Sequence, residues 1–421
     1  MYGYSEGDET LYRKVPKNGD KLSILGFGAM RLPEKDGAID NEKATALLHH
    51  AIDNGINYID TSWTYHKEQS ETFLGDALAG GYREKVRVAT KMPHWLVRSR
   101  QDMDRFLEIQ LKKLRTDHID YYLLHALTEG GWEKIKGYGV REFLDTAKKD
   151  GRIRNVGFSF HDNTEVFKEI VDSYDWDICQ IQYNYLDENS QAGTEGLKYA
   201  AEKGIAVIVM EPLRGGNLVR NIPPEVSEIW NESDVKRAPA EWGLRWVWNH
   251  PEVTVVLSGM NEISQVDENI RTAAEAYPNS LTEKELDTVR KVAEKYRKLM
   301  TIPCTGCRYC MPCPAGVDIP GCFELYNSMN MFKAGGGYNS QYMYIVHHMG
   351  VLGNKTSASL CMNCGRCKEH CPQHIDIPER MEEVEAQFER PGTKLKVTVM
   401  KLFMPFFRQV SLFKNRHRSG N

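Results

Sequence analysis

Eight short apolar segments recur between residues 22 and 259, and a longer amphipathic segment follows each of them. The longer segments have helical period, and the apolar ones have the length of buried strands. Asp40 can cap a helix over residues 41–54 that Gly55 closes, and Ser99 with Asp102 can form a capping box. This alternation favours an α/β fold with a closed (β/α)8 barrel of the TIM type, with a doubly wound open sheet as the alternative. The expected strands are 22–28, 56–60, 86–91, 119–125, 153–159, 177–183, 205–210 and 253–259.

Composition and cysteine usage exclude several classes of protein. With 41% hydrophobic and 27% charged residues and a formal net charge of −4, the chain is typical of soluble globular proteins and is not expected to bind nucleic acid. No segment is long and apolar enough for a transmembrane helix, and the polar start at residues 1–14 argues against a secretory signal. Nine of the ten cysteines fall between residues 304 and 371, unlike a disulfide framework. We therefore expect a reducing, cytoplasmic location.

Four polar residues fall where expected barrel strands end and loops begin: Asp60, Tyr65, Lys91 and His125. A tyrosine titrates near pH ~10 and needs a neighbouring cation to act as an acid at neutral pH. Lys91 can supply that cation, Asp60 can hold the lysine as its ion-pair partner, and His125 can hydrogen-bond a substrate oxygen. A single buried Tyr or His is more often structural, but four compatible groups on consecutive strand ends predict a proton-donating site for a carbonyl.

The segments that carry these residues, "INYIDTSWTY" (56–65), "VATK" (88–91) and "DYYLLH" (120–125), resemble the signature segments of the aldo-keto reductase superfamily. "LSILGFGAMRLP" (22–33) and "GFS" (157–159) are also similar to that family, and the resemblance covers about residues 10–275. It implies a barrel that binds a nicotinamide cofactor without a Rossmann fold. Hydride then passes to a carbonyl while Tyr65 gives the proton.

The resemblance also implies cofactor contacts. It places the carboxamide at Ser159 and Gln180, the pyrophosphate along Leu213, Gly215 and Gly216, and the adenosine at Ser258, Gly259, Gln265, Glu268 and Asn269. His66, His94 and Trp95 are further candidates for shaping the substrate pocket.

Three departures from the family pattern bear on the cofactor. Met210 stands where an aromatic residue often stacks on the nicotinamide, and Phe160 where an Asn often follows the carboxamide serine. Between Ser258 and Ile270 there is no Lys or Arg to recognise a 2′-phosphate. These departures argue against a preference for NADP and favour NAD, or a flavin phosphate at the position of the pyrophosphate. NAD(P)H is the expected cofactor, with FMN as the alternative.

Two cysteine runs, "CTGCRYCMPCP" (304–314) and "CMNCGRCKEHCP" (361–372), follow the barrel region. Three cysteines at C-x2-C-x2-C can hold three corners of an iron–sulfur cube, and a fourth cysteine before Pro typically serves the other cluster. Zinc sites usually pair two C-x2-C knuckles and are the alternative. The spacing predicts two 4Fe–4S clusters, with Cys179 and Cys322 left over as buried thiols.

The cysteine region, residues 300–380, resembles a helical dicluster ferredoxin module. The resemblance implies two ligand sets, namely Cys304, Cys307, Cys310 with Cys371, and Cys361, Cys364, Cys367 with Cys313. The first run has two residues, not three, before its last cysteine, so ligation of one cluster by all four of its own cysteines stays open.

Three domains are expected: an aldo-keto reductase-like barrel at residues 1–300, a helical dicluster domain at 301–390 and a basic amphipathic tail at 391–421. The tail has seven basic and no acidic residues. It is either a surface helix that meets an acidic partner or anionic lipid, or a segment packed on its own domain.

A hydride carries two electrons whereas each cluster passes one. The leading hypothesis is therefore an oxidoreductase acting on a small-molecule carbonyl or alcohol, with clusters that exchange electrons with a one-electron carrier such as ferredoxin or flavodoxin. The alternatives are an NAD(P)H carbonyl reductase with structural or redox-sensing clusters, and a non-catalytic electron-transfer subunit that docks through its tail.

Overall fold

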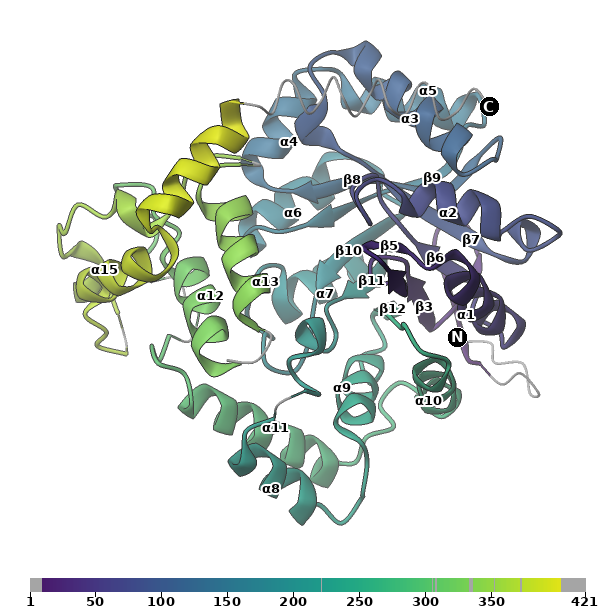
Figure 1. Cartoon of the computed structure of the whole chain (residues 1–421). Coiled ribbons are helices and arrows are strands. Elements are labelled where there is room, and N and C mark those ends of the chain that lie inside the picture. The colour runs from purple at the N-terminus through teal and green to yellow at the C-terminus, as the bar shows by residue number, and fades with distance from the viewer. Residues whose placement is uncertain are drawn as a thin grey trace. The chain divides into compact units, whose positions relative to one another are not determined.

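The computed structural model describes residues 10–220, 222–304, 306, 309–332, 336–351, 353–371 and 373–402. These residues divide into two compact units (Figure 1). The first contains residues 10–215 and 237–286, and the second contains residues 216–236 and 287–402. The domain boundaries expected near residues 300 and 390 stay predictions.

The first unit is built on a closed barrel of eight parallel strands in the order β10-β11-β12-β3-β6-β7-β8-β9. This confirms the (β/α)8 barrel over the open sheet. Seven of the eight strands lie within a residue or two of the expected segments. The strands are β3 (Leu25–Gly28), β6 (Tyr58–Asp60), β7 (Arg87–Met92), β8 (Ile119–Leu127), β9 (Ile153–Phe160), β10 (Ile178–Gln182), β11 (Ala206–Met210) and β12 (Val253–Ser258).

Helices surround these strands (Figure 1) and begin where the sequence signals them. The Asp40 carboxylate accepts the N–H of Lys43, and the Ser99 hydroxyl accepts the N–H of Asp102, as expected for both caps. The helices of this unit are α1 (Asn41–Asp53), α2 (Ser70–Ala77), α3 (Arg100–Lys113), α4 (Glu129–Lys136), α5 (Val140–Lys149), α6 (Thr164–Ser173), α7 (Gly193–Glu202), α9 (Pro239–Trp248) and α10 (Ile263–Ala274).

The expected first strand, residues 22–28, is wrong in one respect, because it divides at Ile24. Its first part, β2 (Lys21–Ser23), pairs antiparallel with β1 (Tyr12–Lys14), and only Leu25–Gly28 joins the barrel. The Ser23 hydroxyl donates to the Leu25 carbonyl at 2.7 Å, which bends the chain there. The apolar run "LSILGFG" has isoleucine at the break itself, a residue typical of strands, so the sequence did not place a break there.

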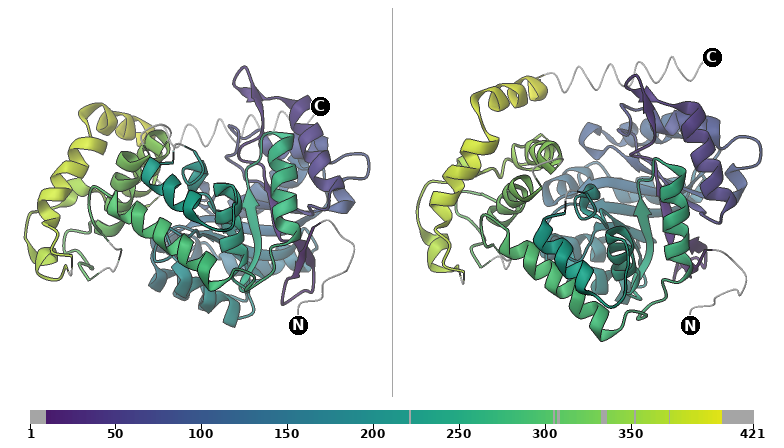
Figure 2. Two further views of the ribbon diagram at one scale, coloured as in Figure 1. Left: turned by 90° about the horizontal axis from the view of Figure 1, so that it is seen from below. Right: turned by 60° about the horizontal axis from the view of Figure 1, so that its bottom comes forward.

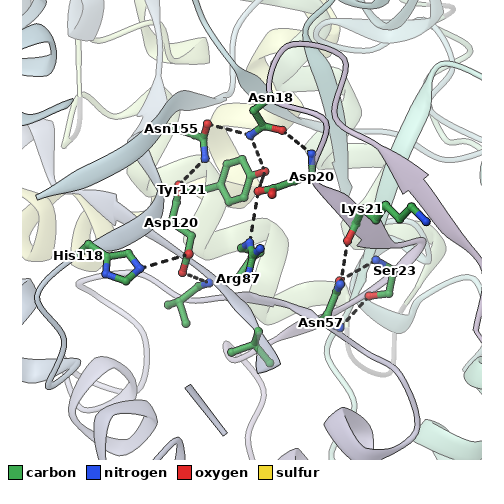
Figure 3. A network of polar contacts seen from close by, with 12 residues as sticks. Asn18, Asp20, Lys21, Ser23, Asn57, Arg87, His118, Asp120, Tyr121 and Asn155 are labelled. Atoms are coloured by element: carbon green, nitrogen blue, oxygen red, sulfur yellow. Dashed lines mark hydrogen bonds and ion pairs between the residues drawn. The ribbon is translucent and has the colours of Figure 1, made fainter. Parts of the chain in front are cut away.

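The β1–β2 hairpin covers the end of the barrel where the strands begin. Val15 and Leu22 pack into the same buried cluster as the barrel residues Tyr58 and Tyr121. Polar contacts hold the hairpin tip (Figure 3): Asn18 donates to the Tyr121 hydroxyl at 3.1 Å, and that hydroxyl donates to Asp20 at 2.8 Å. The hairpin therefore covers the barrel core at this end, and the strands finish at the opposite end.

The second unit is helical, as expected for residues 301–390. Its core includes Cys322, Phe323 and Met381, together with Tyr344 and Phe388, whose rings stack at 4.3 Å. α12 packs on α13 and α15, the green and yellow helices of Figure 2. The helices are α8 (Pro224–Glu232), most of α11 (Glu283–Lys298), α12 (Ile319–Met331), α13 (Gly336–Met343), a π-helical turn (Tyr344–His348), α14 (Arg366–Glu369), α15 (Ile377–Phe388) and a helix over residues 391–402. Residues 403–421 of the expected tail lie outside the described residues.

Within the ranges described above, no helix combines the length and the apolar character that crossing a membrane requires.

Candidate functional site

The end of the barrel at which the strands finish brings the four expected residues together. The Nζ atom of Lys91, on β7, lies 2.6 Å from the Asp60 carboxylate at the end of β6 and 3.3 Å from the hydroxyl of Tyr65. It also donates to the Thr61 carbonyl at 2.9 Å. The rings of Tyr65 and His125 meet edge to face, with centroids 6.1 Å apart. One ammonium therefore has its donors committed to an acidic side chain and to the phenol.

Burial and charge set the protonation states of this group. Burial raises the pKa of Tyr65, and Lys91 only partly offsets this effect. Burial by itself lowers the pKa of Lys91. Asp60 and Tyr65 together raise this pKa by more than burial lowers it, so the net pKa lies above the ordinary value. Burial, followed by the charge of Lys91, holds the pKa of His125 well below its ordinary value. At neutral pH the site thus contains a protonated phenol, an ammonium and an uncharged imidazole.

A buried polar network behind β7 supports Lys91, and the sequence interpretation missed it. Glu71 is fully buried and accepts from Thr90 at 2.6 Å, from Gln110 at 2.6 Å and from Lys113 at 3.2 Å. The Gln110 amide also donates to the Lys91 carbonyl at 3.1 Å. The available signal was that Gln110 and Lys113 share the buried face of α3 with its apolar residues. The network fixes the strand that carries the ammonium.

Of the three candidate pocket residues, Trp95 lies beside the site, with its ring centroid 5.3 Å from that of His125. His94 is buried, and burial, followed by the charge of Lys134, lowers its pKa to about 4. His66 accepts the N–H of Leu32 at 3.1 Å through one ring nitrogen. Trp95 is thus the residue of the three that can flank a substrate at His125.

Ser159 and Gln180 are opposite each other on β9 and β10, and both are buried. The Ser159 hydroxyl oxygen accepts the N–H of Ala126 at 2.7 Å, so its proton remains available to donate. The Gln180 Oε1 atom is buried without a hydrogen-bond partner among the described residues. An unpaired buried acceptor beside a free donor fits a primary amide, which supplies both complements.

The expected pyrophosphate segment forms a tight turn over Arg214–Gly216. Gly215 has φ of 66° and Gly216 has φ of 95°, a left-handed region that favours glycine. Leu213 packs against Gly243, since a Cβ added to Gly243 would lie 2.6 Å from the Leu213 side chain. Such a turn presents backbone N–H groups without side chains in the way, which suits a phosphate group.

At the expected adenosine segment, Ser258 ends β12 and accepts from the Asn269 amide at 3.1 Å. Gln265 accepts the N–H of Asn261 at 2.9 Å. Gly259 and Glu268 are exposed. These contacts organise the start of α10 as one compact turn.

Lys43 and Arg31 bring positive charge to this segment from elsewhere in the chain, which the sequence interpretation missed because it considered only residues 258–270. Lys43 of α1 pairs with Glu262 at 2.6 Å, and His50 of α1 contacts Asp267 at 2.6 Å. Arg31 lies against Gly259, since a Cβ added there would come within 3.0 Å of its side chain. The local acidic residues are therefore balanced by charge from α1 and from residue 31.

Two departures from the family pattern have a structural account. Phe160 is fully buried and packs against Phe167 of α6, with ring centroids 5.1 Å apart, so it faces the helix layer. Met210, at the end of β11, is half-buried and packs against the barrel core.

In the second unit, the second expected ligand set lines one small pocket. Apolar side chains complete its wall, and the four cysteines are Cys313, Cys361, Cys364 and Cys367. Burial, with neighbouring thiols adding to it, raises the pKa of Cys367 to about 11. A group of four cysteines around one pocket fits a centre whose positive irons stabilise thiolates.

The other set is described in part. Cys304, Cys310 and Cys371 are each half-buried against the core of the second unit, and Cys307 lies outside the described residues. Cys313 lies with the second run, which favours ligands exchanged between the runs. The assignment of both sets stays a prediction.

A buried carboxylate holds the turn that precedes Cys361. Glu389 accepts the Tyr344 hydroxyl at 2.8 Å and the N–H and hydroxyl of Ser359 at 3.1 and 2.6 Å. The Tyr344 hydroxyl in turn accepts the N–H of Ala358 at 2.9 Å. Ser359 is thus held by Glu389 at the end of α15, and Ala358 is held by Tyr344 of the π-helical turn.

Replacing Glu389 with Gln places an amide donor among groups that already donate. We expect iron to leave the protein roughly tenfold faster, because a charge-assisted buried hydrogen bond is lost next to the Cys361 loop. Iron release to a ferrous chelator under anaerobic conditions measures this. Glu382→Gln, an exposed change of the same charge on α15, is the control. Equal release rates for the two variants would contradict the role of Glu389.

Comparison with known proteins agrees with this geometry. The family model described as "Aldo/keto reductase family" matches residues 24–294, and the model "4Fe-4S dicluster domain" matches residues 303–375. L-galactose dehydrogenase of Arabidopsis thaliana is 26% identical over 306 residues, which cover 68% of this chain and 95% of that protein. NADH-specific methylglyoxal reductase of Escherichia coli is 25% identical over 323 residues, covering 65% and 95%.

Solved structures share the barrel. The holo form of an aldo-keto reductase from Bacillus halodurans has a TM-score of 0.57 at 27% identity and covers 67% of this chain and 95% of that one. An aldo-keto reductase from Klebsiella pneumoniae in complex with NADPH has a TM-score of 0.56 at 23% identity, covers 66% and 94%, and supports the fold alone. The chain therefore belongs to the aldo/keto reductase family, and it is an oxidoreductase with a C-terminal 4Fe–4S dicluster domain.

Proposed function

We propose that the protein interconverts a small carbonyl compound and its alcohol, with Tyr65 as the general acid in the reducing direction. We further propose that two 4Fe–4S clusters in the second unit exchange electrons with an external one-electron carrier. The observation that carries the barrel chemistry is the contact of one buried ammonium, Lys91, with both Asp60 and the Tyr65 hydroxyl.

The side chains divide the work as follows. Tyr65 donates a hydrogen bond and then its proton to the carbonyl oxygen, and Lys91 stabilises the phenolate that remains. His125, kept neutral by burial and by Lys91, donates to the same oxygen and orients the carbonyl. Asp60 holds the ammonium in place, and Trp95 flanks the substrate. The relatives named for L-galactose and methylglyoxal indicate small polar hydroxy or oxo compounds as the substrate class.

A nicotinamide held at Ser159 and Gln180 supplies the hydride. The buried, unpaired Gln180 oxygen supports this choice, because a carboxamide can donate to it and the ring of FMN has no primary amide. Lys43 and Arg31 supply positive charge near the adenosine segment, so a 2′-phosphate is compatible with the local acidic residues.

The proposed ligands are Cys304, Cys307, Cys310 and Cys371 for one cluster, and Cys313, Cys361, Cys364 and Cys367 for the other. The single pocket shared by the second set supports this division. Clusters of this kind supply electrons one at a time.

Tyr65→Phe removes the proton donor and leaves the ring in place. We expect the rate of methylglyoxal reduction with NADH or NADPH to fall about 10²- to 10⁴-fold, with the cluster absorption unchanged. Tyr199→Phe is the matched control, since its hydroxyl also donates to a carboxylate, Asp172, but on the surface. Unchanged turnover in Tyr65→Phe would remove Tyr65 from the mechanism.

The pH dependence of carbonyl reduction follows from the pKa shifts. Tyr65 keeps its proton to above pH ~10, and His125 stays neutral down to below pH ~6.5, so neither group changes state between these limits. We expect kcat/KM for reduction to be flat from pH about 6.5 to about 9.5. A descending limb centred between pH about 7 and about 8 would mean that another group is the acid.

The electron relay is tested with reduced methyl viologen as the one-electron donor. We expect it to drive methylglyoxal reduction in anaerobic protein supplied with a catalytic amount of nicotinamide. Cys361→Ser should lower the viologen-driven rate at least ~10-fold and leave the NADH-driven rate within about twofold of wild type, because Cys361 serves the clusters alone. If wild type reacts with the nicotinamide but not with viologen, the clusters are structural or redox-sensing.

A further inference from the structure

The helix over residues 391–402 has one anchored side and one exposed apolar side. Val397 is 5% exposed and packs in the core of the second unit. Leu395, Val399 and Leu402 are 66%, 44% and 72% exposed. Spacings of four and three residues place these three on one helical face, opposite Val397. Large apolar side chains aligned in this way on a surface indicate a contact with something apolar.

Lysines border the exposed apolar row on both sides. By helical period, Lys396 lies on one flank, and Lys394 and Lys401 lie on the other. Lys394 also reaches Glu385 at 2.7 Å. Lys401 lies at the loop that contains Gly350, since a Cβ added to Gly350 would be 3.0 Å from the Nζ atom of Lys401. Burial lowers the pKa of Lys401, and the nearby charge of Lys355 lowers it further. Lys401 and Lys355 thus bring two positive charges together at this loop.

The sequence remains basic beyond the described helix. From Pro391 to Asn421 there are seven Lys and Arg residues and no Asp or Glu. Three of them, Lys394, Lys396 and Lys401, lie on the described helix. With Lys355 near Lys401 they make four basic residues, which is within the range typical of segments that bind anionic lipid. Lysine is depleted in the cores of protein–protein interfaces, whereas at a bilayer its long stem reaches the headgroups while the neighbouring apolar side chains enter the acyl boundary.

We propose that this lysine-flanked face, made by Leu395, Val399, Leu402 and Lys396 with Lys401 and Lys355, docks the second unit on an anionic lipid surface. The apolar row inserts at the boundary between headgroups and acyl chains, and the ammonium groups bind lipid phosphates. The proposal does not depend on the carbonyl chemistry of the barrel.

Co-sedimentation of the full chain, purified anaerobically with its clusters, tests the proposal. We expect the protein to pellet with vesicles of equal parts phosphatidylglycerol and phosphatidylcholine, and to remain in solution with phosphatidylcholine alone. Raising the salt concentration should release it, because the attraction of lysines to a charged surface is screened.

Two double variants separate the charged and apolar contributions. Lys396→Gln with Lys401→Gln should weaken binding on the order of 25-fold, and Leu395→Ser with Leu402→Ser should weaken it at least ~10-fold. The matched controls are Lys291→Gln with Lys298→Gln on α11, and Val235→Ser with Tyr277→Ser at exposed apolar positions elsewhere. The controls should bind as wild type does, and equal cluster absorption in all variants shows that they are folded.

Five outcomes would overturn the proposal. These are wild type that stays in solution with anionic vesicles, equal binding to both vesicle types, and controls that lose as much binding as the face variants. The fourth is a protein that binds no vesicles and is a dimer in light scattering, where Leu395→Ser with Leu402→Ser dissociates the dimer. A second copy of the chain would then cover the face. Binding to immobilised polyglutamate without binding to vesicles would likewise assign the face to an acidic protein.

Discussion

The ion pair between Lys91 and Asp60 is the interaction on which the barrel site depends. Both side chains are at most 2% exposed, and moving two charges out of water costs several kcal/mol per ion, which their attraction repays only in good geometry. Lys91 has three partners here, since it also donates to the Thr61 carbonyl and the Tyr65 hydroxyl. The second Asp60 oxygen, however, is buried without a hydrogen-bond partner among the described residues, and burial raises the Asp60 pKa. A buried pair is weak support for stability, so its presence at the open end of the barrel is better explained by its effect on neighbouring groups.

That effect extends to residues with no charge of their own. The positive charge of Lys91 partly offsets the rise that burial causes in the Tyr65 pKa, and it adds to the fall that burial causes in the His125 pKa. Burial therefore keeps the phenol protonated, while the ammonium favours its ionised form and helps to keep the imidazole neutral. The Glu71 and Gln110 network holds β7 from its other side. Because Gln110 lies on α3 and donates to the Lys91 carbonyl, the buried face of α3 helps to position the Lys91 ammonium.

The second unit uses a similar arrangement. Glu389 is buried, and its oxygens accept three donors, two of them from the turn that leads into Cys361. In both units a buried carboxylate is fully engaged by donors and positions a strand end or loop that carries a functional side chain. Polar groups in such surroundings tolerate little displacement, because an unmade bond costs its full desolvation.

The sequence by itself determined the eight strands, the helix caps at Asp40 and Ser99, and the four residues at the barrel mouth, because period, capping and strand ends are local properties of the chain. It missed the break at Ile24, since the apolar run was continuous and the division depends on the pairing of Lys21–Ser23 with Tyr12–Lys14. Only the tertiary structure decided that Lys43 and Arg31 supply charge to the 258–269 segment, and that Cys313 joins the cysteines of the second run at one pocket. These are contacts between residues far apart in the chain, and spacing along a sequence carries no information on which distant groups the packing brings together.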